Sequence, residues 1–334
     1  RERWLKKRSL EYGVLAVDSA RGHSSHEQNP FIVLKRPSAD EFQGEVMGFS
    51  LVYSGNFLAQ AEVESHGTTR ILLGINPFCF DWKLDPGESF QTPEAVLVYS
   101  HRGLNDMSQT FHRLFQRRLA RGFWRDRPRP ILINNWEATY FDFTEERLLE
   151  LAEKARSCGV ELFVLDDGWF GKRSSSRAGL GDWTANRERL PDGLAGLAEK
   201  INALGMAFGL WIEPEMVNAD SDLYRAHPDW ILRVPGRTPC HGRYQFVLDF
   251  SRPEIVDYLY ERISALLEEA NIAYLKWDMN RSITDCYSAA LPADRQGEVF
   301  HRYILGVYRL YERLHTAFPQ VLFESCASGG ARFD

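Results

Sequence analysis

The chain has 334 residues and a net charge of −6, and its residues are 44% hydrophobic and 26% charged. These values are typical of a globular protein larger than one ordinary domain. The acidic balance argues against a nucleic-acid partner, because such binding normally needs a basic face, and the absence of any apolar run of about 18 residues predicts no membrane span.

The sequence is strand-like up to about residue 100. Apolar residues at helical spacing from Leu104 to Arg121 then predict a connecting helix, and the Pro-rich stretch "RDRPRP" predicts a boundary. We divide the chain into a sandwich over 1–103, a helical linker over 104–129 and a second domain over 130–334. The antiparallel sandwich is predicted from β-rich runs separated by Gly, Pro, Asp and Ser: "YGVLAV", "FIVLK", "GFSLVYSGNFLAQAEV", "RILLGI" and "EAVLVYS".

Strand-like runs and helical patterns alternate after that boundary. We count six strand-plus-helix steps, whose strands are "PILINNWE", "ELFVLDDGW", "AFGLWIEPEMV", "YQFVLDFS", "IAYLKWDM" and "VLFESCASGG". Thr144 and Ser251 are expected to cap two of the helices, Ser251 in a capping box with Glu254. Repeated units of this kind build either a (β/α)8 barrel or a doubly wound open sheet.

Polar residues at the strand ends discriminate between these two folds. A ring of functional groups at the carboxyl ends of successive strands is typical of a barrel active site, whereas an open sheet uses one switch point and usually a Gly-rich loop. We therefore predict a multidomain β plus α/β protein with about six of eight TIM-barrel units. The ring comprises Asn135, Trp136, Glu137, Asp166, Asp167, Glu213, Glu215, Asp249, Lys276, Asp278, Glu324 and Cys326.

Carboxylates and tryptophans dominate this ring. Carboxylates can serve as nucleophile, acid or base, and an indole face offers a platform for a sugar ring, so glycoside chemistry is indicated. A metal-dependent hydrolase is an alternative, because Asp166, Asp167 and Glu213 could hold a divalent ion. We predict no metal, since no His lies at ligand spacing on these strands, and Cys326 likewise lacks a strand-end His to activate it as a nucleophile.

The stretch "YLKWDMNRS" places charged residues inside a strand-like run. Strand alternation puts Lys276, Asp278 and Asn280 on one face. A nearby ammonium favours an ionised carboxylate, so we expect Lys276 to keep Asp278 anionic and able to attack the reactive carbon of a sugar. The alternative is a buried ion pair that only fixes the strand.

Five stretches of the sequence resemble the α-galactosidases of glycoside hydrolase family 36: "LFVLDDGWFGKR", "GLWIEPEMV", "YLKWDMNR", "HRYILGVYRL" and "ESCASGGARFD". The resemblance implies retaining hydrolysis of terminal α-galactosides such as melibiose, raffinose and stachyose, without a cofactor. It implies a β-supersandwich, of which residues 1–103 would be the C-terminal part, followed by the barrel. It also implies a homo-oligomer, with a tetramer as one such assembly.

The resemblance further implies roles for individual residues. Asp278 would be the nucleophile, and the general acid/base is expected beyond Asp334, because Asp334 matches a different, structural aspartate of the family. "CASGGAR" departs from the family's purer Gly run through Ala327 and Ala331. The residues expected to bind the sugar are Asp166 and Asp167 at O4 and O6, Trp211 as a wall, Arg243, Lys276, and Cys326 with Gly329 near O2; Asn280 is added for the face it shares with Asp278.

Other interpretations stay open at this point. Related barrels include α-N-acetylgalactosaminidases and plant galactosyl transferases, and a galactoside-binding fragment without catalysis is a further alternative. The sequence starts at Arg1 and stops at "ARFD", so we expect a fragment that is inactive in isolation. Five cysteines without a CxxC pair predict reduced thiols, and with no signal peptide we expect a cytoplasmic protein.

Overall fold

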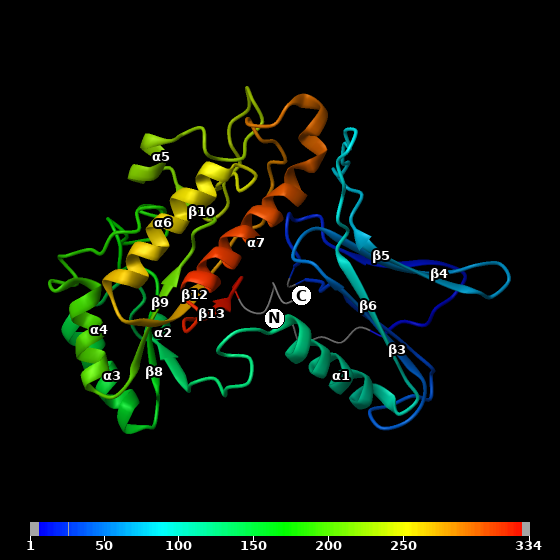
Figure 1. Ribbon diagram of the computed structural model, residues 1–334, viewed down its shortest axis with the longest axis horizontal. Coiled ribbons are helices and arrows are strands. Elements are labelled where there is room, and N and C mark those ends of the chain that lie inside the picture. Colours follow the sequence, from blue (N-terminus) through cyan, green and yellow to red (C-terminus); the bar gives the residue numbers. More distant parts are fainter. Residues whose placement is uncertain (1–6, 26, 329–334) are drawn as a thin grey trace.

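The computed structural model describes residues 7–25 and 27–328. Antiparallel strands of the N-terminal part lie on one side of the molecule and an α/β part lies on the other (Figure 1). Helix α7 (Val299–Ala317) lies between them and faces both. Among the described residues, no helix is both long and apolar enough to cross a membrane.

The N-terminal part consists of two three-stranded antiparallel sheets. One has the order β1 (Gly13–Asp18), β4 (Phe57–Val63), β5 (Thr69–Ile75), and the other has the order β2 (Phe31–Lys35), β3 (Val46–Val52), β6 (Glu94–Ser100). Helix α1 (Gly103–Leu114) continues into the π-helical turn η1 (Phe115–Leu119). Met107 and Phe111 pack on Val46 and Val98 of the second sheet. The predicted antiparallel strands and the helix after them are confirmed.

The α/β part is built on one parallel sheet with the order β13-β12-β9-β8-β7. Helices on one face of this sheet connect its strands (Figure 1). This curved run of βα units is part of a (β/α)8 barrel, as predicted. Its strands are β7 (Leu132–Asn134), β8 (Leu162–Leu165), β9 (Ala207–Ile212), β12 (Ile272–Trp277) and β13 (Leu322–Ser325), and its helices are α2 (Trp136–Thr139), α3 (Glu145–Ser157), α4 (Gly193–Ala203), α5 (Asp222–Ala226), α6 (Pro253–Glu269), the 3₁₀ turn η2 (Ala293–Glu298) and α7.

One of the six predicted sheet strands is not in this sheet. The run "YQFVLDFS" forms β11 (Gln245–Val247), which pairs antiparallel with β10 (Met216–Asn218). The place beside β9 is taken by β12, with Lys276 opposite Trp211 in the register. The continuous apolar run led to the wrong prediction because all three residues of β11 are buried, and strands in the core of a parallel sheet have the same run. The described sheet therefore has five strands instead of six.

One of the two predicted helix caps is wrong. The Thr144 hydroxyl accepts the N–H of Arg147 and begins α3 as expected. Ser251 instead donates its hydroxyl to Asp249 at 2.5 Å, and α6 begins with Pro253 in its first turn and no side-chain cap. Proline at this position has no N–H to satisfy, which reduces the need for a cap.

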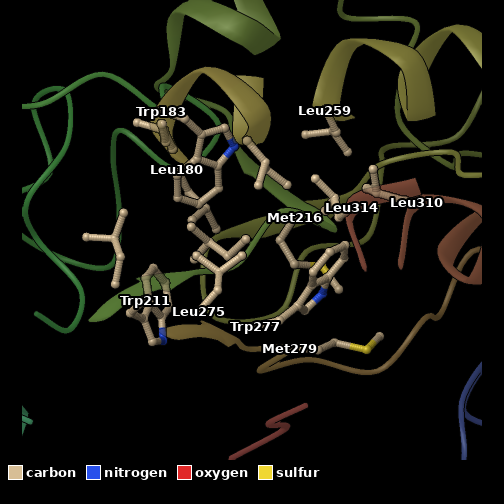
Figure 2. Close-up of a cluster of buried hydrophobic side chains, with 14 of the residues drawn as sticks. Leu180, Trp183, Trp211, Met216, Leu259, Leu275, Trp277, Met279, Leu310 and Leu314 are labelled. Atoms are coloured by element: carbon tan, nitrogen blue, oxygen red, sulfur yellow. The ribbon is translucent and has the colours of Figure 1, made fainter. Parts of the chain in front are cut away.

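The core lies where the sheet meets its helices (Figure 2). Leu275, Trp277 and Met279 of the β12 segment belong to it and are 0–2% exposed. The Trp277 indole N–H donates a hydrogen bond at 2.8 Å to Glu215 and so provides this buried carboxylate with a partner. These three apolar side chains anchor one face of the segment, so the intervening residues are presented on the other face, as the alternation predicts.

Candidate active site

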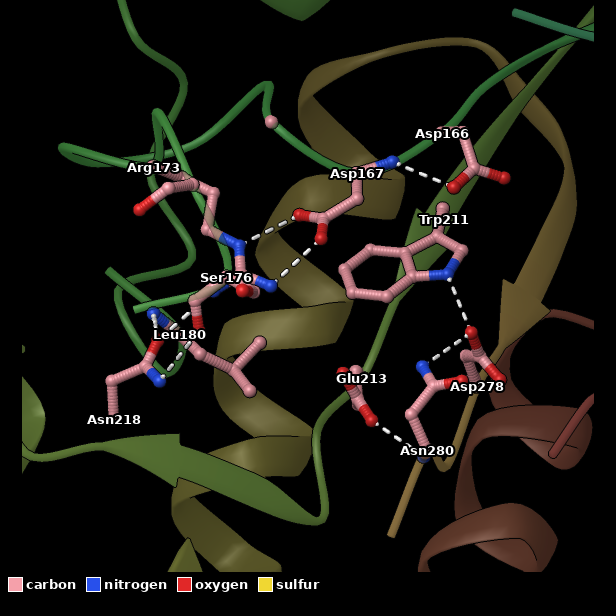
Figure 3. Close-up of polar contacts among 12 residues, drawn as sticks. Asp166, Asp167, Arg173, Ser176, Leu180, Trp211, Glu213, Asn218, Asp278 and Asn280 are labelled. Carbon is pink, nitrogen blue, oxygen red and sulfur yellow. Dashed lines mark hydrogen bonds and ion pairs between the residues drawn. The ribbon is translucent and has the colours of Figure 1, made fainter. Parts of the chain in front are cut away.

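The carboxyl ends of β8, β9 and β12 bring six predicted or strand-end residues together. Figure 3 shows these residues around the Trp211 indole, with Asp278 bonded to the indole and Asp167 facing Arg173. Parallel strands present their carboxyl ends at one edge, which explains why residues over 100 positions apart meet here. The six residues are Asp166 and Asp167 after β8, Trp211 and Glu213 at the end of β9, and Asp278 and Asn280 after β12.

Asp278 lies at the centre and is 6% exposed. Its Oδ2 accepts hydrogen bonds from the Trp211 indole at 3.1 Å and the Asn280 side-chain amide at 2.7 Å. Its Oδ1 accepts from the backbone N–H groups of Met279 at 2.9 Å and Ser328 at 3.3 Å. Four uncharged N–H donors therefore fix the orientation of this carboxylate, and its own strand and two neighbouring ones provide them.

Lys276 forms its ion pair with Asp166 and not with Asp278, although the Asp278 charge still contributes to the raised pKa of Lys276. The expectation that Lys276 keeps Asp278 anionic stays a prediction. The Lys276 ammonium contacts Asp166 at 2.8 Å, and Asn134 donates to the same Asp166 oxygen at 2.9 Å. Burial is the largest single influence and lowers the pKa of Lys276. The charge and hydrogen bond of Asp166, with smaller contributions from Cys326 and Asp278, together outweigh burial and leave this pKa raised. For Asp166, burial dominates over Lys276 and raises the pKa of the carboxyl. The two groups thus form an ion pair across the sheet, with Asp166 buried and Lys276 partly exposed.

Asp167 forms the second ion pair of the site. Arg173 approaches it with two parallel hydrogen bonds, Nε to Oδ1 at 2.8 Å and a terminal nitrogen to Oδ2 at 2.7 Å. The other terminal nitrogen donates to Asn218 at 3.0 Å and to the Ala178 carbonyl at 3.1 Å. Both charged side chains are nearly inaccessible, at 1% and 9% exposure. A bidentate arginine that is itself held by further hydrogen bonds fixes both the position and the plane of a carboxylate.

Glu213 is the most buried carboxyl of the group at 1% exposure. It accepts the Asn280 backbone N–H at 2.6 Å and the Gln245 amide at 2.9 Å. Burial, followed by the negative charge of Asp278, raises the pKa of Glu213 to about 8. A carboxyl with this pKa carries its proton at neutral pH and adds no second negative charge beside Asp278.

Three further expected site residues are not among these six, and one of them, Cys326, lies near enough to Lys276 to influence its pKa. Arg243 is exposed, in the turn before β11, at a φ of 54°, and its side chain makes no hydrogen bond or ion pair with residues 7–25 or 27–328. Cys326 is buried after β13, where its N–H donates to the Trp277 carbonyl at 2.7 Å. Gly329 lies outside the described residues, as does Asp334.

Two functional side chains were not among the predicted site residues. Arg173 belongs to the stretch "DDGWFGKR", and its place six residues after Asp167 was a signal that could have found it. The sequence places Glu213 in the ring of strand-end groups and offers it as a metal ligand, but it does not assign Glu213 a role in the reaction, because its burial and its bond to Asn280 depend on the tertiary structure. In the described part of the chain, no group of three or more His, Cys, Asp or Glu residues is arranged to hold a metal ion.

Comparison with known families identifies the chain. A model of the melibiase family matches residues 89–334, and a model of the glycosyl hydrolase family 36 N-terminal domain matches residues 1–85. The chain belongs to glycoside hydrolase family 36. The resemblance noted in the sequence is thereby confirmed.

Relatives in this family are similar over the whole chain. The α-galactosidase AgaA of Geobacillus stearothermophilus is 60% identical, and Mel36A of Lactobacillus acidophilus is 48% identical; the chain covers 46% of each. The AgaA crystal structure superposes with a TM-score of 0.98 over 100% of this chain, and variants of AgaA have been solved with raffinose and with stachyose. The Lactobacillus brevis α-galactosidase structure gives 0.94 at 52% identity, covering 97% of this chain and 44% of that one. The chain therefore spans about half the length of these family 36 relatives.

Proposed function

We propose that this family 36 chain is part of a retaining α-galactosidase, an enzyme that hydrolyses terminal α-galactosyl residues of oligosaccharides of the melibiose, raffinose and stachyose type. The observation that carries the proposal is the Asp278 carboxylate, held by four N–H donors at the meeting point of three strand ends. The α-galactosidase relatives, with their raffinose and stachyose complexes, support the substrate class.

In the proposed reaction, Asp278 attacks the anomeric carbon and displaces the leaving oxygen, which gives a covalent galactosyl-enzyme. Water then attacks that carbon and releases galactose with retained configuration. A second carboxyl must protonate the leaving oxygen and later take a proton from the water. We propose that residues beyond Asp334 contribute this acid/base. No cofactor takes part in either step.

The remaining site residues are proposed to bind galactose. Lys276 and Asp166 pair with each other and still have donor and acceptor capacity for sugar hydroxyls. Asp167 is fixed by Arg173 in the same way. The proposed roles of Trp211 as a wall, of Asn280 and Arg243 as further contacts, and of Cys326 with Gly329 near O2 rest on the family resemblance.

Broader properties of the protein are also proposals. We propose a division into a supersandwich part over 1–103, a linker over 104–129 and a barrel over 130–334. We further propose a cytoplasmic homo-oligomer, a tetramer being one possible assembly, in which cysteines stay reduced. The described cysteines are free thiols, which is compatible with that compartment. Residues 1–334 alone are proposed to be inactive.

A different family activity would be seen in the products. Transfer of galactose to another sugar, or release of N-acetylgalactosamine, needs the same nucleophile but a different acceptor or 2-substituent. Product analysis with sucrose present, and a parallel assay on an aryl α-N-acetylgalactosaminide, separate these activities from hydrolysis. The proposal predicts free galactose as the main product.

The test of the proposed function uses the full-length protein that contains these residues. Asp278→Asn keeps the size and part of the hydrogen bonding of Asp278 but removes the nucleophilic charge. We expect turnover of an aryl α-galactoside to be lost with an unchanged melting temperature within a few degrees. Turnover near the wild-type rate in this variant would refute the assignment.

A further inference from the structure

Glu213 has a place in the site that the reaction described above does not use. Its carboxyl lies one residue beyond the β9 strand, and the β9–β12 ladder ends at the same level, where Trp277 is opposite Ile212. The N–H of Asp278 still donates to the Ile212 carbonyl at 2.8 Å. The next N–H that points the same way, that of Asn280, donates to the Glu213 side chain at 2.6 Å.

This side chain therefore replaces a missing backbone acceptor. In a parallel pair, alternate residues of one strand bond to the same neighbour, so Asn280 would continue the pattern set by Asp278. The backbone of β9 turns away after Ile212, at Glu213 and Pro214, and no longer offers a carbonyl there. The Glu213 carboxyl accepts this hydrogen bond in place of a backbone carbonyl, and so it extends the contact between the ends of β9 and β12 to Asn280.

The position of Asn280 matters because its side chain holds Asp278. The Asn280 amide donates to Asp278 Oδ2 at 2.7 Å, and its own oxygen accepts from the Ser328 hydroxyl at 2.5 Å. A shift of the backbone at Asn280 would move this amide and rotate the carboxylate that it holds. Figure 3 shows the series Glu213, Asn280 and Asp278.

The electrostatic environment keeps Glu213 neutral. Burial and the charges of Asp278 and Asp167 raise the pKa of Glu213, while the Asn280 N–H and the Arg173 guanidinium oppose them. A neutral carboxyl still offers its carbonyl oxygen to the Asn280 N–H. Glutamine has the same shape and keeps the oxygen that faces the Asn280 N–H. Its amide N–H can donate to the Gln245 oxygen once the Gln245 amide turns over, since that oxygen has no partner among the described residues. Methionine has a similar volume without an oxygen.

We propose that Glu213 is a positioning residue for the reaction: it fixes the backbone at Asn280, and the Asn280 amide in turn orients the Asp278 carboxylate for attack. The inference rests on the proposed function, in which Asp278 is the nucleophile. Glu213 acts through hydrogen bonding alone and transfers no proton to the substrate.

The experiment compares Glu213→Gln and Glu213→Met in the full-length protein, by kcat and KM on an aryl α-galactoside well below each melting temperature. We expect glutamine to lower kcat by no more than about threefold, and methionine to lower it by about 10–100-fold while KM changes less than about threefold. Glu213→Ala carries the same expectation as methionine where methionine prevents folding. The matched control is Glu145→Gln, at a buried glutamate that begins α3 and pairs with Lys200, where kcat should not change.

Two results would overturn the inference. Wild-type kcat in the methionine variant would show that Glu213 only fills space. A glutamine variant as inactive as Asp278→Asn would show that Glu213 transfers a proton itself. The wild-type assay is read first, because absence of α-galactosidase activity there refutes the proposed function, whereas an active wild type with either result above refutes only the role of Glu213.

Discussion

The aspartates at the ends of β8 and β12 are held in opposite ways. Asp166 and Asp167 each face a cation, Lys276 and Arg173, at 2.7–2.8 Å. Asp278 instead accepts four hydrogen bonds from uncharged N–H groups. A carboxylate in a close ion pair is well suited to bind hydroxyls in a fixed place, and one held by neutral donors keeps its charge available for a covalent bond. From this difference we propose that the β8 end binds the sugar and that the β12 end provides the attacking carboxylate.

Removing the β12 cation that pairs with Asp166 should have the largest effect. Lys276→Met leaves Asp166 buried without its counter-ion, which typically costs about 3–5 kcal/mol of stability. We expect kcat/KM to fall by about 10²–10³-fold, since a sugar contact and the placement of Asp166 are lost together. Steady-state kinetics and thermal melting of the full-length protein measure both, with exposed Lys154→Met on α3 as the control. Wild-type kcat/KM would show that the ion pair has no part in binding.

Changing the geometry of a cation without its charge should have a smaller effect. Arg173→Lys keeps the positive charge but cannot form the two parallel hydrogen bonds to Asp167. We expect KM to rise about tenfold with kcat changed less than about threefold, because Asp167 is assigned to binding. A fall in kcat at constant KM would show that Asp167 acts in the chemical step and not in sugar binding.

Removing one neutral donor to Asp278 should have a modest effect, and it should lower kcat where Arg173→Lys raises KM. Trp211→Phe keeps an aromatic ring that can pack beside Phe170 but loses the indole N–H to Asp278 Oδ2. Three donors still hold the carboxylate, so we expect kcat to fall by about 3–10-fold with little change in KM. A rise in KM alone would show that the indole contributes only to the sugar platform.

Glu213→Gln should change the pH dependence of stability more than it changes the reaction rate. The pKa of Glu213 in the folded protein is about 8, above its ordinary value of 4.5. Between these values the unfolded chain releases a proton that the folded protein keeps, so the wild type loses stability as pH rises, by about 1.4 kcal/mol per pH unit. Glutamine does not titrate, so the variant should gain melting temperature relative to the wild type from pH 5 to 8. The exposed Glu199→Gln is the control, and a constant difference would contradict a protonated Glu213.

The sequence predicted the parts of this fold that depend on local patterns. The antiparallel runs before residue 100, the helix after them and five of the parallel strands follow from hydrophobic periodicity and turn residues. The misassigned strand, β11, is short and wholly buried, so its pattern equals that of a core strand. Its antiparallel partner β10 is set by the turn after β9, which no periodicity encodes.

The sequence predicted which residues lie in the site but not which residues they contact. Strand alternation placed Lys276 and Asp278 on one face correctly, but it fixes a face and not a contact. Lys276 pairs with Asp166, 110 positions away, because the end of β8 lies within its reach. Glu213 was missed as a positioning residue for the same reason, since its role depends on where β9 and β12 separate.

The central claim is that Asp278 alone forms the covalent bond to galactose, and mass spectrometry tests it most directly. The full-length protein is treated with a fluorinated α-galactosyl fluoride, which forms the galactosyl-enzyme faster than water removes it, and is then digested with trypsin. We expect one galactosyl adduct, on the peptide 277–281, carried by Asp278. An adduct on Asp166, Asp167 or Glu213, or inactivation that leaves peptide 277–281 unmodified, would contradict the account.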